Sequence, residues 1–224
     1  MPTLEREGDV FVLDLGADEN RFHPDWLAEL RTRLDEAAST EGPKALVTTG
    51  SGKFFSNGLD LDWLGANGDK LAGYVHEIHG VFAQVLAFPA PTVAAIQGHA
   101  FAGGGMLALA HDLRVMREDR GWFCLPEADI NIPFSRGMTA LIQAKLDPAA
   151  QAEAMLTARR YTGPEALGAG IVEATAAEAE VRSTAIARAA ALAGKDGLTQ
   201  ATIKRRMYAT ALALLEDRES NPLE

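Results

Sequence analysis

Apolar residues follow two alternating rhythms along this chain. Short, nearly continuous apolar runs are typical of buried β-strands, and the longer stretches between them carry apolar residues at steps of three and four, as amphipathic helices do. The expected strands are residues 10–15, 44–48, 92–97, 113–117 and 171–174. The expected helices are one that begins at Pro24, then residues 71–86, 103–109, 136–145 and 148–158, and a short helix from Pro164.

Strands that alternate with helices of ten or more residues are typical of crossover connections within a largely parallel sheet. We therefore expect an α/β fold, with residues 1–175 as its core. Residues 176–224 are expected to form a C-terminal helical region of the same single domain. Two helices are expected there, separated at Gly194 and Gly197.

Residues 78–111 contain no Asp, Glu, Lys or Arg, and a stretch of this length is long enough to cross a membrane. Pro89 and Pro91 would break such a helix, and Gln97 and His99 add polar groups. We interpret the stretch as the end of one buried helix, a buried strand and the start of a further helix. No membrane span is expected.

The composition and net charge of the chain limit the kinds of molecule that it is expected to bind. The chain has 224 residues, 47% of them hydrophobic and 23% charged, which is ordinary for a globular protein. Its net charge of −10 makes nucleic acid and anionic membranes unexpected partners, although local cations or backbone amides suffice for a small anionic ligand.

The cysteine content and the two ends of the chain indicate in which cellular compartment the protein is expected. Cys124 is the one cysteine, so no intrachain disulfide is possible, and its apolar neighbours favour a place in the core. The five histidines show no metal-binding spacing, so no metal is expected. The N-terminus has no apolar stretch and the last four residues match no address tag, so a cytoplasmic location is expected.

Three consecutive glycines, at 103–105, precede an apolar helix. Exposed N–H groups at a helix N-terminus favour negative charge, and a missing Cβ lets a ligand approach the backbone. Close packing of the helix is the alternative explanation. The run also satisfies the dinucleotide fingerprint G-x-G-x-x-A, but residues 99–102 separate it from the preceding strand, so an NAD-binding oxidoreductase stays only as a rival hypothesis.

Glu127 follows Pro126 within an apolar stretch at residues 122–134 that is expected to be extended. A carboxyl group in such surroundings loses hydration, which favours its neutral form and suits it to proton transfer. A surface glutamate at a helix start is the alternative. The loop at residues 54–61 contains an Asn57-Gly58 turn and a segment that is expected to be helical from Leu59.

Three of these segments together resemble the crotonase superfamily, the enoyl-CoA hydratases and isomerases. They are KFFSNGLDL at 53–61, AAIQGHAFAGGGMLALAHD at 94–112 and FCLPEADINIP at 123–133, and TARRYTGPEALGAGIVEA at 157–174 agrees as well. The resemblance implies a spiral of ββα units with a C-terminal helical region used in assembly, as a homotrimer or hexamer. It also implies an acyl-CoA thioester substrate, with no separate cofactor because CoA is part of the substrate.

The family's site residues carry over to matching positions of this chain. The resemblance places the two backbone N–H groups of an oxyanion hole at Leu59 and Gly104, and it makes Glu127 the catalytic acid and base. It implies that Ser56 and Asn57 lie beside the adenine end of CoA and that Arg21 or Lys53 meets its phosphates. Gly58, Gly103 and Leu107 are the remaining expected substrate contacts.

One position departs from the pattern of the family's hydratases, which use two glutamates. The first would stand at Leu107 here, and the second is Glu127. One glutamate can still move a proton from C2 to C4, so the expected activity is a Δ3-to-Δ2 enoyl-CoA isomerase of fatty-acid β-oxidation, similar to the plant-type members. A hydratase or another reaction of the superfamily, which would make the protein a lyase, and a non-catalytic acyl-CoA-binding protein are the alternatives. Asp129 and Asp112 are rival bases.

Overall fold

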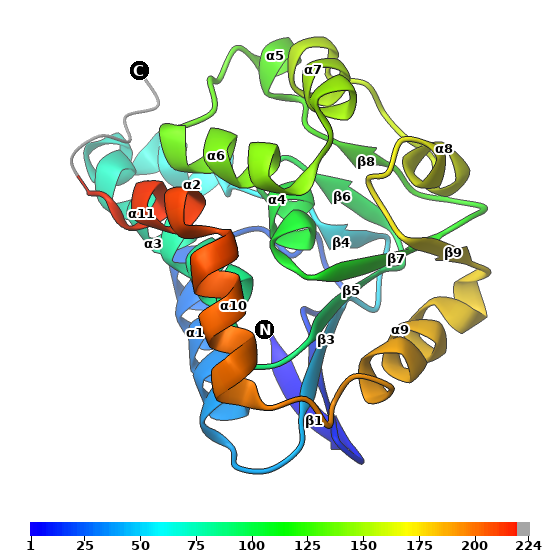
Figure 1. Cartoon of the computed structure of the whole chain (residues 1–224). Helices are drawn as coiled ribbons and strands as arrows, with labels where there is room; N and C mark the ends of the chain where they lie inside the picture. Colours follow the sequence, from blue (N-terminus) through cyan, green and yellow to red (C-terminus); the bar gives the residue numbers. More distant parts are fainter. Residues whose placement is uncertain (219–224) are drawn as a thin grey trace.

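Two sheets organise the chain, and the computed structural model describes residues 1–218 of it (Figure 1). The larger sheet has six strands in the order β1-β2-β3-β5-β7-β9, all parallel except for the antiparallel pair β1 and β2. These strands are β1 (Thr3–Glu7), β2 (Val10–Asp14), β3 (Ala45–Thr49), β5 (Thr92–Ile96), β7 (Leu113–Arg117) and β9 (Ala174–Ala176). The smaller, parallel sheet is β4 (Phe54–Ser56), β6 (His99–Phe101) and β8 (Phe123–Cys124).

The chain alternates between the two sheets as it advances. Strands β3, β5 and β7 lie in the large sheet, and each is followed by a strand of the small one, β4, β6 and β8. Helices then lead back to the large sheet. The expected spiral of ββα units is therefore confirmed.

The helices after each pair of strands differ in number and length. They are α1 (Pro24–Ser39), α2 (Leu61–Ala66), the 3-10 turn η1 (Gly68–Lys70), α3 (Leu71–Leu86), α4 (Gly103–Ala110), α5 (Glu127–Ile130), α6 (Arg136–Lys145), α7 (Pro148–Thr157) and α8 (Gly163–Gly168). The C-terminal part contains the turn η2 (Glu178–Glu180), α9 (Val181–Ala190), α10 (Gly197–Met207) and α11 (Ala209–Glu216).

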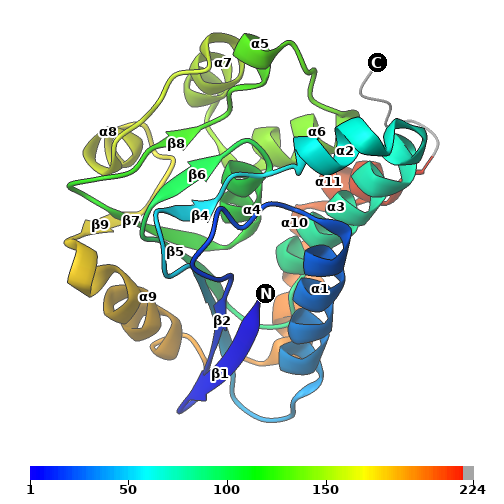
Figure 2. The ribbon, with the colours of Figure 1, turned by 180° about the vertical axis from the view of Figure 1, so that it is seen from behind.

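Both faces of the large sheet are covered, as is usual for parallel strands. Alternate residues such as Val12, Val47 and Val93 pack with α9 on one face (Figure 1). The other face joins α1, α3, α4, α6 and α11 in the main core, and the view from behind shows α1 beside α3 (Figure 2). This burial explains why the strands read as continuous apolar runs.

The sequence pattern missed β1, β4, β6 and β8, with β4 falling in a segment expected to be a loop, and it misplaced the last strand. Strands of two or three residues, such as β6 and β8, are too short to show an alternating pattern. The strand predicted at residues 171–174 is instead β9, which begins at Ala174. The apolar side chains of Ile171 and Val172 are buried in the main core without belonging to a strand. Glu173 forms an ion pair with Arg114.

The C-terminal region has three helices within residues 181–216, where two were predicted. The break that the pattern missed lies at Tyr208, between α10 and α11. The Lys204 ammonium, which is buried, donates to the Ala90 carbonyl at 2.7 Å and pairs with Asp112 at 2.6 Å. These contacts attach α10 to the core. Within residues 1–218, no helix combines the length and the hydropathy needed to cross a membrane.

Candidate active site

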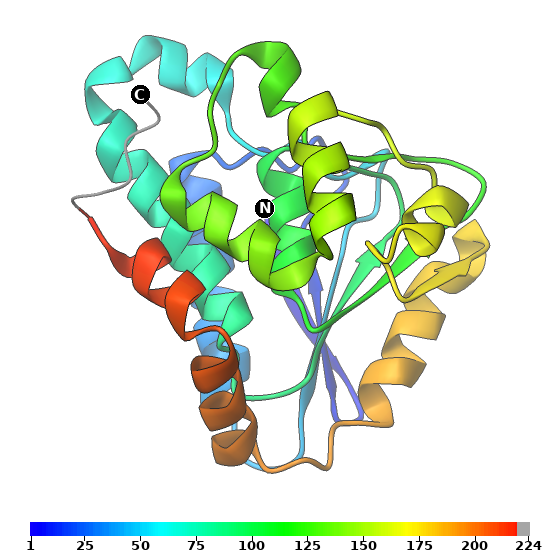
Figure 3. The same ribbon diagram turned by 45° about the horizontal axis from the view of Figure 1, so that its top comes forward.

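A cavity of about 340 Å³ lies between the start of α2, the end of β6 and α5. Figure 3 shows α2, in cyan, and α5, in green, at the same end of the molecule. Most of the wall is apolar, and polar groups come from Arg21, Asn57, Asp62 and Glu127. The remaining lining residues are Leu59, Leu61, Phe101, Ala102, Pro126, Ile130 and Ile132.

Glu127 is the first residue of α5 and is only 6% exposed. Its Oε2 is buried without a hydrogen-bond partner among the described residues. Burial raises the pKa of this carboxyl from 4.5 to about 7. The expectation of an extended backbone here is wrong, because Pro126 caps a short helix, but the apolar environment inferred for the side chain is present.

A fixed peptide plane determines the direction of the Leu59 N–H. The Gly58 carbonyl accepts a hydrogen bond from Phe22 N–H at 2.8 Å. Because the peptide is planar and trans, the N–H of Leu59 points away from that carbonyl. It donates to no acceptor within residues 1–218. The helix expected from Leu59 begins two residues later, with the Asp60 side chain capping α2 through Trp63 N–H at 3.1 Å.

The glycine run forms the first turn of α4, and the N–H of Gly104 has no acceptor within the described residues. Ala102, the residue before the glycine run, has a φ of 50°, which is strained for a residue with a side chain. A Cβ on Gly104 would lie 2.2 Å from the Ser56 carbonyl oxygen, and one on Gly58 would lie 2.6 Å from Gly103 N. The loop that carries Leu59 therefore contacts the start of α4 so closely that only glycine fits.

The structure brings some of the predicted ligand contacts to the cavity and not others. Arg21 and Asn57 line it, and Arg21 is bonded to Glu19 and Asp62. Ser56 is fully buried, and its hydroxyl donates to the Asn20 carbonyl at 2.7 Å and accepts from Gly58 N–H at 3.1 Å. The Ser56 side chain is thus part of the loop's internal support and does not face this cavity.

Four more predicted contacts do not line the cavity either: Lys53, Gly58, Gly103 and Leu107. The Lys53 ammonium lies 5.3 Å from the centre of the Phe54 ring. Leu107 is 1% exposed, within the main core. The position at which a hydratase would carry its first glutamate is therefore apolar and buried in this chain.

Neither rival base reaches the cavity. Asp129 is exposed on α5. Asp112 accepts from Thr92 N–H at 2.8 Å and forms the ion pair with Lys204. No group of three His, Cys, Asp or Glu side chains within residues 1–218 is arranged to hold a metal ion.

Several residues at the site escaped sequence reasoning. Phe101, Ile130 and Ile132 complete the apolar wall, but apolar residues in short elements give no signal for a cavity. Tyr74 lies within the helix expected at residues 71–86, and the helical pattern gives no sign of a role at the site. Its hydroxyl in fact accepts a hydrogen bond from the Asp60 N–H at 2.8 Å, directly after Leu59.

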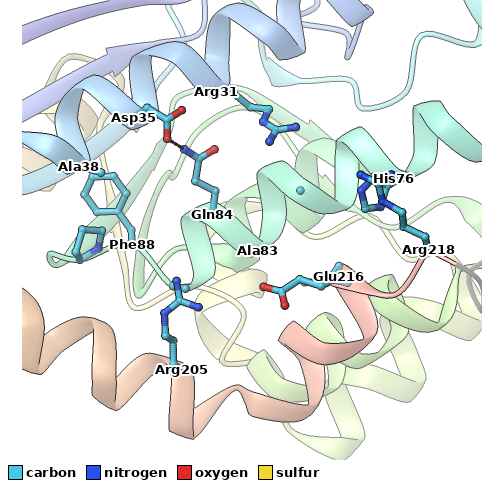
Figure 4. Close-up of a pocket in the computed structure, with 14 residues that line it drawn as sticks. Arg31, Asp35, Ala38, His76, Ala83, Gln84, Phe88, Arg205, Glu216 and Arg218 are labelled. Atoms are coloured by element: carbon cyan, nitrogen blue, oxygen red, sulfur yellow. Dashed lines mark hydrogen bonds between the residues drawn. The ribbon is translucent and has the colours of Figure 1, made fainter.

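A larger cavity of about 520 Å³ lies elsewhere, between α1, α3 and the α10–α11 pair (Figure 4). Its charged side chains have both signs, including Arg31, Arg205, Asp35 and Glu216. None of the predicted site residues lines it. The smaller cavity at Glu127 is therefore the candidate active site.

The chain is similar to known proteins of one enzyme family. Residues 5–221 match the enoyl-CoA hydratase/isomerase family. Enoyl-CoA delta isomerase 3 of Arabidopsis thaliana is 42% identical over 221 residues, which cover 93% of this chain and 92% of that protein. Peroxisomal enoyl-CoA delta isomerase 2 of the same plant is 39% identical, with 96% and 95% covered.

The fold has a close counterpart among solved structures. An enoyl-CoA isomerase from Mycobacterium tuberculosis superposes with a TM-score of 0.87 at 26% identity, over 96% of this chain and 93% of that one. The family match spans nearly the whole chain, and the same ββα spiral surrounds the cavity at Glu127. This protein belongs to the enoyl-CoA hydratase/isomerase family.

Proposed function

We propose that this protein is a Δ3-to-Δ2 enoyl-CoA isomerase that works with Glu127 as its one catalytic carboxylate. The observation that carries the proposal is a buried carboxyl group, with no hydrogen-bond partner for its Oε2 within residues 1–218, in an apolar cavity whose wall also includes Leu59. The names of the two Arabidopsis relatives support the same reaction.

The thioester carbonyl oxygen would accept hydrogen bonds from the N–H groups of Leu59 and Gly104, which have no other acceptor within residues 1–218. Glu127 then takes a proton from C2, and the electron pair of the C2–H bond generates an enolate. Preorganised donors stabilise such an oxyanion, and losing one typically costs about 3 kcal/mol of transition-state stabilisation. Return of the same proton to C4 moves the double bond from C3–C4 to C2–C3, so atoms and charge balance.

A raised pKa suits this exchange. A carboxyl whose pKa is about 7 is partly ionised near neutral pH, so it can accept the proton, and its conjugate acid can return it. The mostly apolar wall offers few polar groups that could hold water beside the intermediate. The polar end of the cavity, at Arg21 and Asn57, is the proposed side for the CoA moiety.

Water addition fits the site less well. The other carboxylate that lines the cavity within the described residues is Asp62, which is 87% exposed and paired with Arg21. Leu107 offers no carboxylate to hold a water molecule. A trimeric or hexameric assembly, a cytoplasmic location and the division at residue 175 stay predictions.

The test uses one preparation, assayed with 3-enoyl-CoA and with 2-enoyl-CoA substrates. We expect conversion of the 3-enoyl to the 2-enoyl thioester and little 3-hydroxyacyl-CoA. Glu127→Gln is expected to lower kcat at least a hundredfold, whereas Asp129→Asn, two residues away on the exposed side of α5, leaves it unchanged. Full activity in Glu127→Gln, or fast hydration of 2-enoyl-CoA by the wild type, would contradict the proposal.

A further inference from the structure

We infer that Tyr74 is a positioning residue for the oxyanion hole, which it supports from α3 through the peptide that follows Leu59. The inference rests on the proposed function, because it concerns the stabilisation of the enolate. Tyr74 does not line the cavity at Glu127. Its effect would pass through the backbone of the loop.

The hydroxyl of Tyr74 accepts a hydrogen bond from Asp60 N–H at 2.8 Å. Tyr74 is 4% exposed, and its ring lies 5.1 Å from that of Trp63, centre to centre. The Trp63 N–H in turn donates to the Asp60 side chain at 3.1 Å. Asp60 is thus held on two sides by one pair of neighbouring aromatic residues, through the hydroxyl of Tyr74 and the backbone N–H of Trp63.

Leu59 lies between two peptide planes, each with its own anchor. The Phe22 N–H holds the plane before it through the Gly58 carbonyl, and Tyr74 holds the plane after it through Asp60 N–H. The carbonyl of this second plane, that of Leu59, also accepts a hydrogen bond from Leu61 N–H at 3.1 Å. Tyr74 is therefore the contact by which α3 fixes this peptide.

Loss of the hydroxyl leaves Asp60 N–H, a part-buried donor, without its acceptor. Rotation of the Leu59–Asp60 peptide toward another acceptor would displace the Leu59 backbone. Misplacement of a catalytic group by about 1 Å costs on the order of a hundredfold in rate. Tyr74→Phe keeps the ring, so the change is confined to this hydrogen bond.

The experiment compares Tyr74→Phe with Tyr208→Phe. Tyr208→Phe also removes a hydrogen-bonded hydroxyl, which accepts from Lys145 Nζ at 3.1 Å. Tyr208 lies between α10 and α11, away from the loop that carries Leu59. We expect Tyr74→Phe to lower kcat at least tenfold with little change in KM, because an interaction that strengthens in the transition state is lost. Tyr208→Phe should keep wild-type kcat at a comparable melting temperature.

Two further readouts separate positioning from simple destabilisation. The affinity for a 3-ketoacyl-CoA, which can bind as its enolate, should fall more in Tyr74→Phe than the affinity for a saturated acyl-CoA of equal length. The apparent pKa of the kcat profile should not move, because Glu127 is untouched. Equal losses for both ligands, or an unchanged kcat, would overturn the inference while leaving the proposed function intact.

Hydrogen exchange on the wild type tests the same idea without a variant. The Asp60 amide is expected to exchange slowly, as a donor held by Tyr74. Fast exchange in the folded protein would overturn the inference even if Tyr74→Phe did not fold. Absence of isomerase activity in the wild type would instead remove the proposed function, and the inference with it.

Discussion

Gly104 lies so close to Ser56 that a methyl group on its α-carbon would be 2.2 Å from the Ser56 carbonyl oxygen. The neighbouring atom belongs to the backbone, so no side-chain rotation relieves the clash. This contact joins the first turn of α4 to β4. It thereby fixes the spacing between the N–H groups of Gly104 and Leu59, which are proposed to bind the thioester oxygen.

Gly104→Ala is therefore expected to separate the two N–H groups and to lower kcat/KM at least a hundredfold, with a lower melting temperature. Gly73→Ala is the matched control, because a Cβ on this helical residue meets nothing within 4 Å and alanine favours the helix. Steady-state kinetics and thermal unfolding of both variants measure the difference. Near-normal activity in Gly104→Ala would refute this account of the contact.

The pH dependence of activity follows from the carboxyl of Glu127. Proton abstraction requires its ionised form, and burial raises its pKa to about 7. The rate should therefore rise with pH and level off above an apparent pKa near 7. A profile of kcat/KM from pH 5 to 9 checks this, and a midpoint near 4.5 would mean that the carboxyl is hydrated.

The stability of the fold should also depend on pH through Glu127, but it should fall as pH rises, whereas activity rises. The pKa of Glu127 is raised in the folded protein, so folding disfavours its ionised form, and the free energy of unfolding falls as pH rises from about 4.5 to about 7. The full effect is on the order of 3 kcal/mol. Glu127→Gln removes it, so this variant should be more stable than wild type at pH 8, by denaturant unfolding, with the difference shrinking at pH 4.

The ion pair between Lys204 and Asp112 attaches α10 to the core, and the Lys204 side chain is 5% exposed. Lys204→Ala leaves Asp112 without this partner and is expected to cost about 3 kcal/mol of stability. Arg205→Ala, at the next and exposed position, should cost little. The double variant Asp112→Asn, Lys204→Met should lose less than Lys204→Ala, and an equal loss would show that the ion pair is not the cause.

The sequence pattern predicted the large sheet well because both of its faces are buried. Strands such as β3 and β5 consist entirely of buried residues, and burial requires a run of apolar side chains. The long helix α3 was predicted for a related reason, since its apolar residues form one stripe toward the core. Three site residues, Glu127, Leu59 and Gly104, were named from motifs, and the structure places Glu127 and Leu59 in one cavity.

Other features depend on contacts between distant segments. The strands β4, β6 and β8 exist because β6 pairs with β4, more than forty residues earlier, and with β8, more than twenty residues later. Two or three residues carry no periodic signal of their own. The burial of Ser56 and Leu107 could not be foreseen, since a motif indicates a residue's position in the chain but not which neighbours surround its side chain.

Local patterns of apolar residues, turns and glycines were sufficient to indicate an α/β chain with a carboxyl group suited to proton transfer. The raised pKa of Glu127, the Leu59 N–H that has no acceptor within residues 1–218 and the hydrogen bond from Asp60 to Tyr74 arise only when separate segments come together. Desolvation and hydrogen-bond direction are properties of the folded surroundings, and no stretch of sequence contains those surroundings by itself.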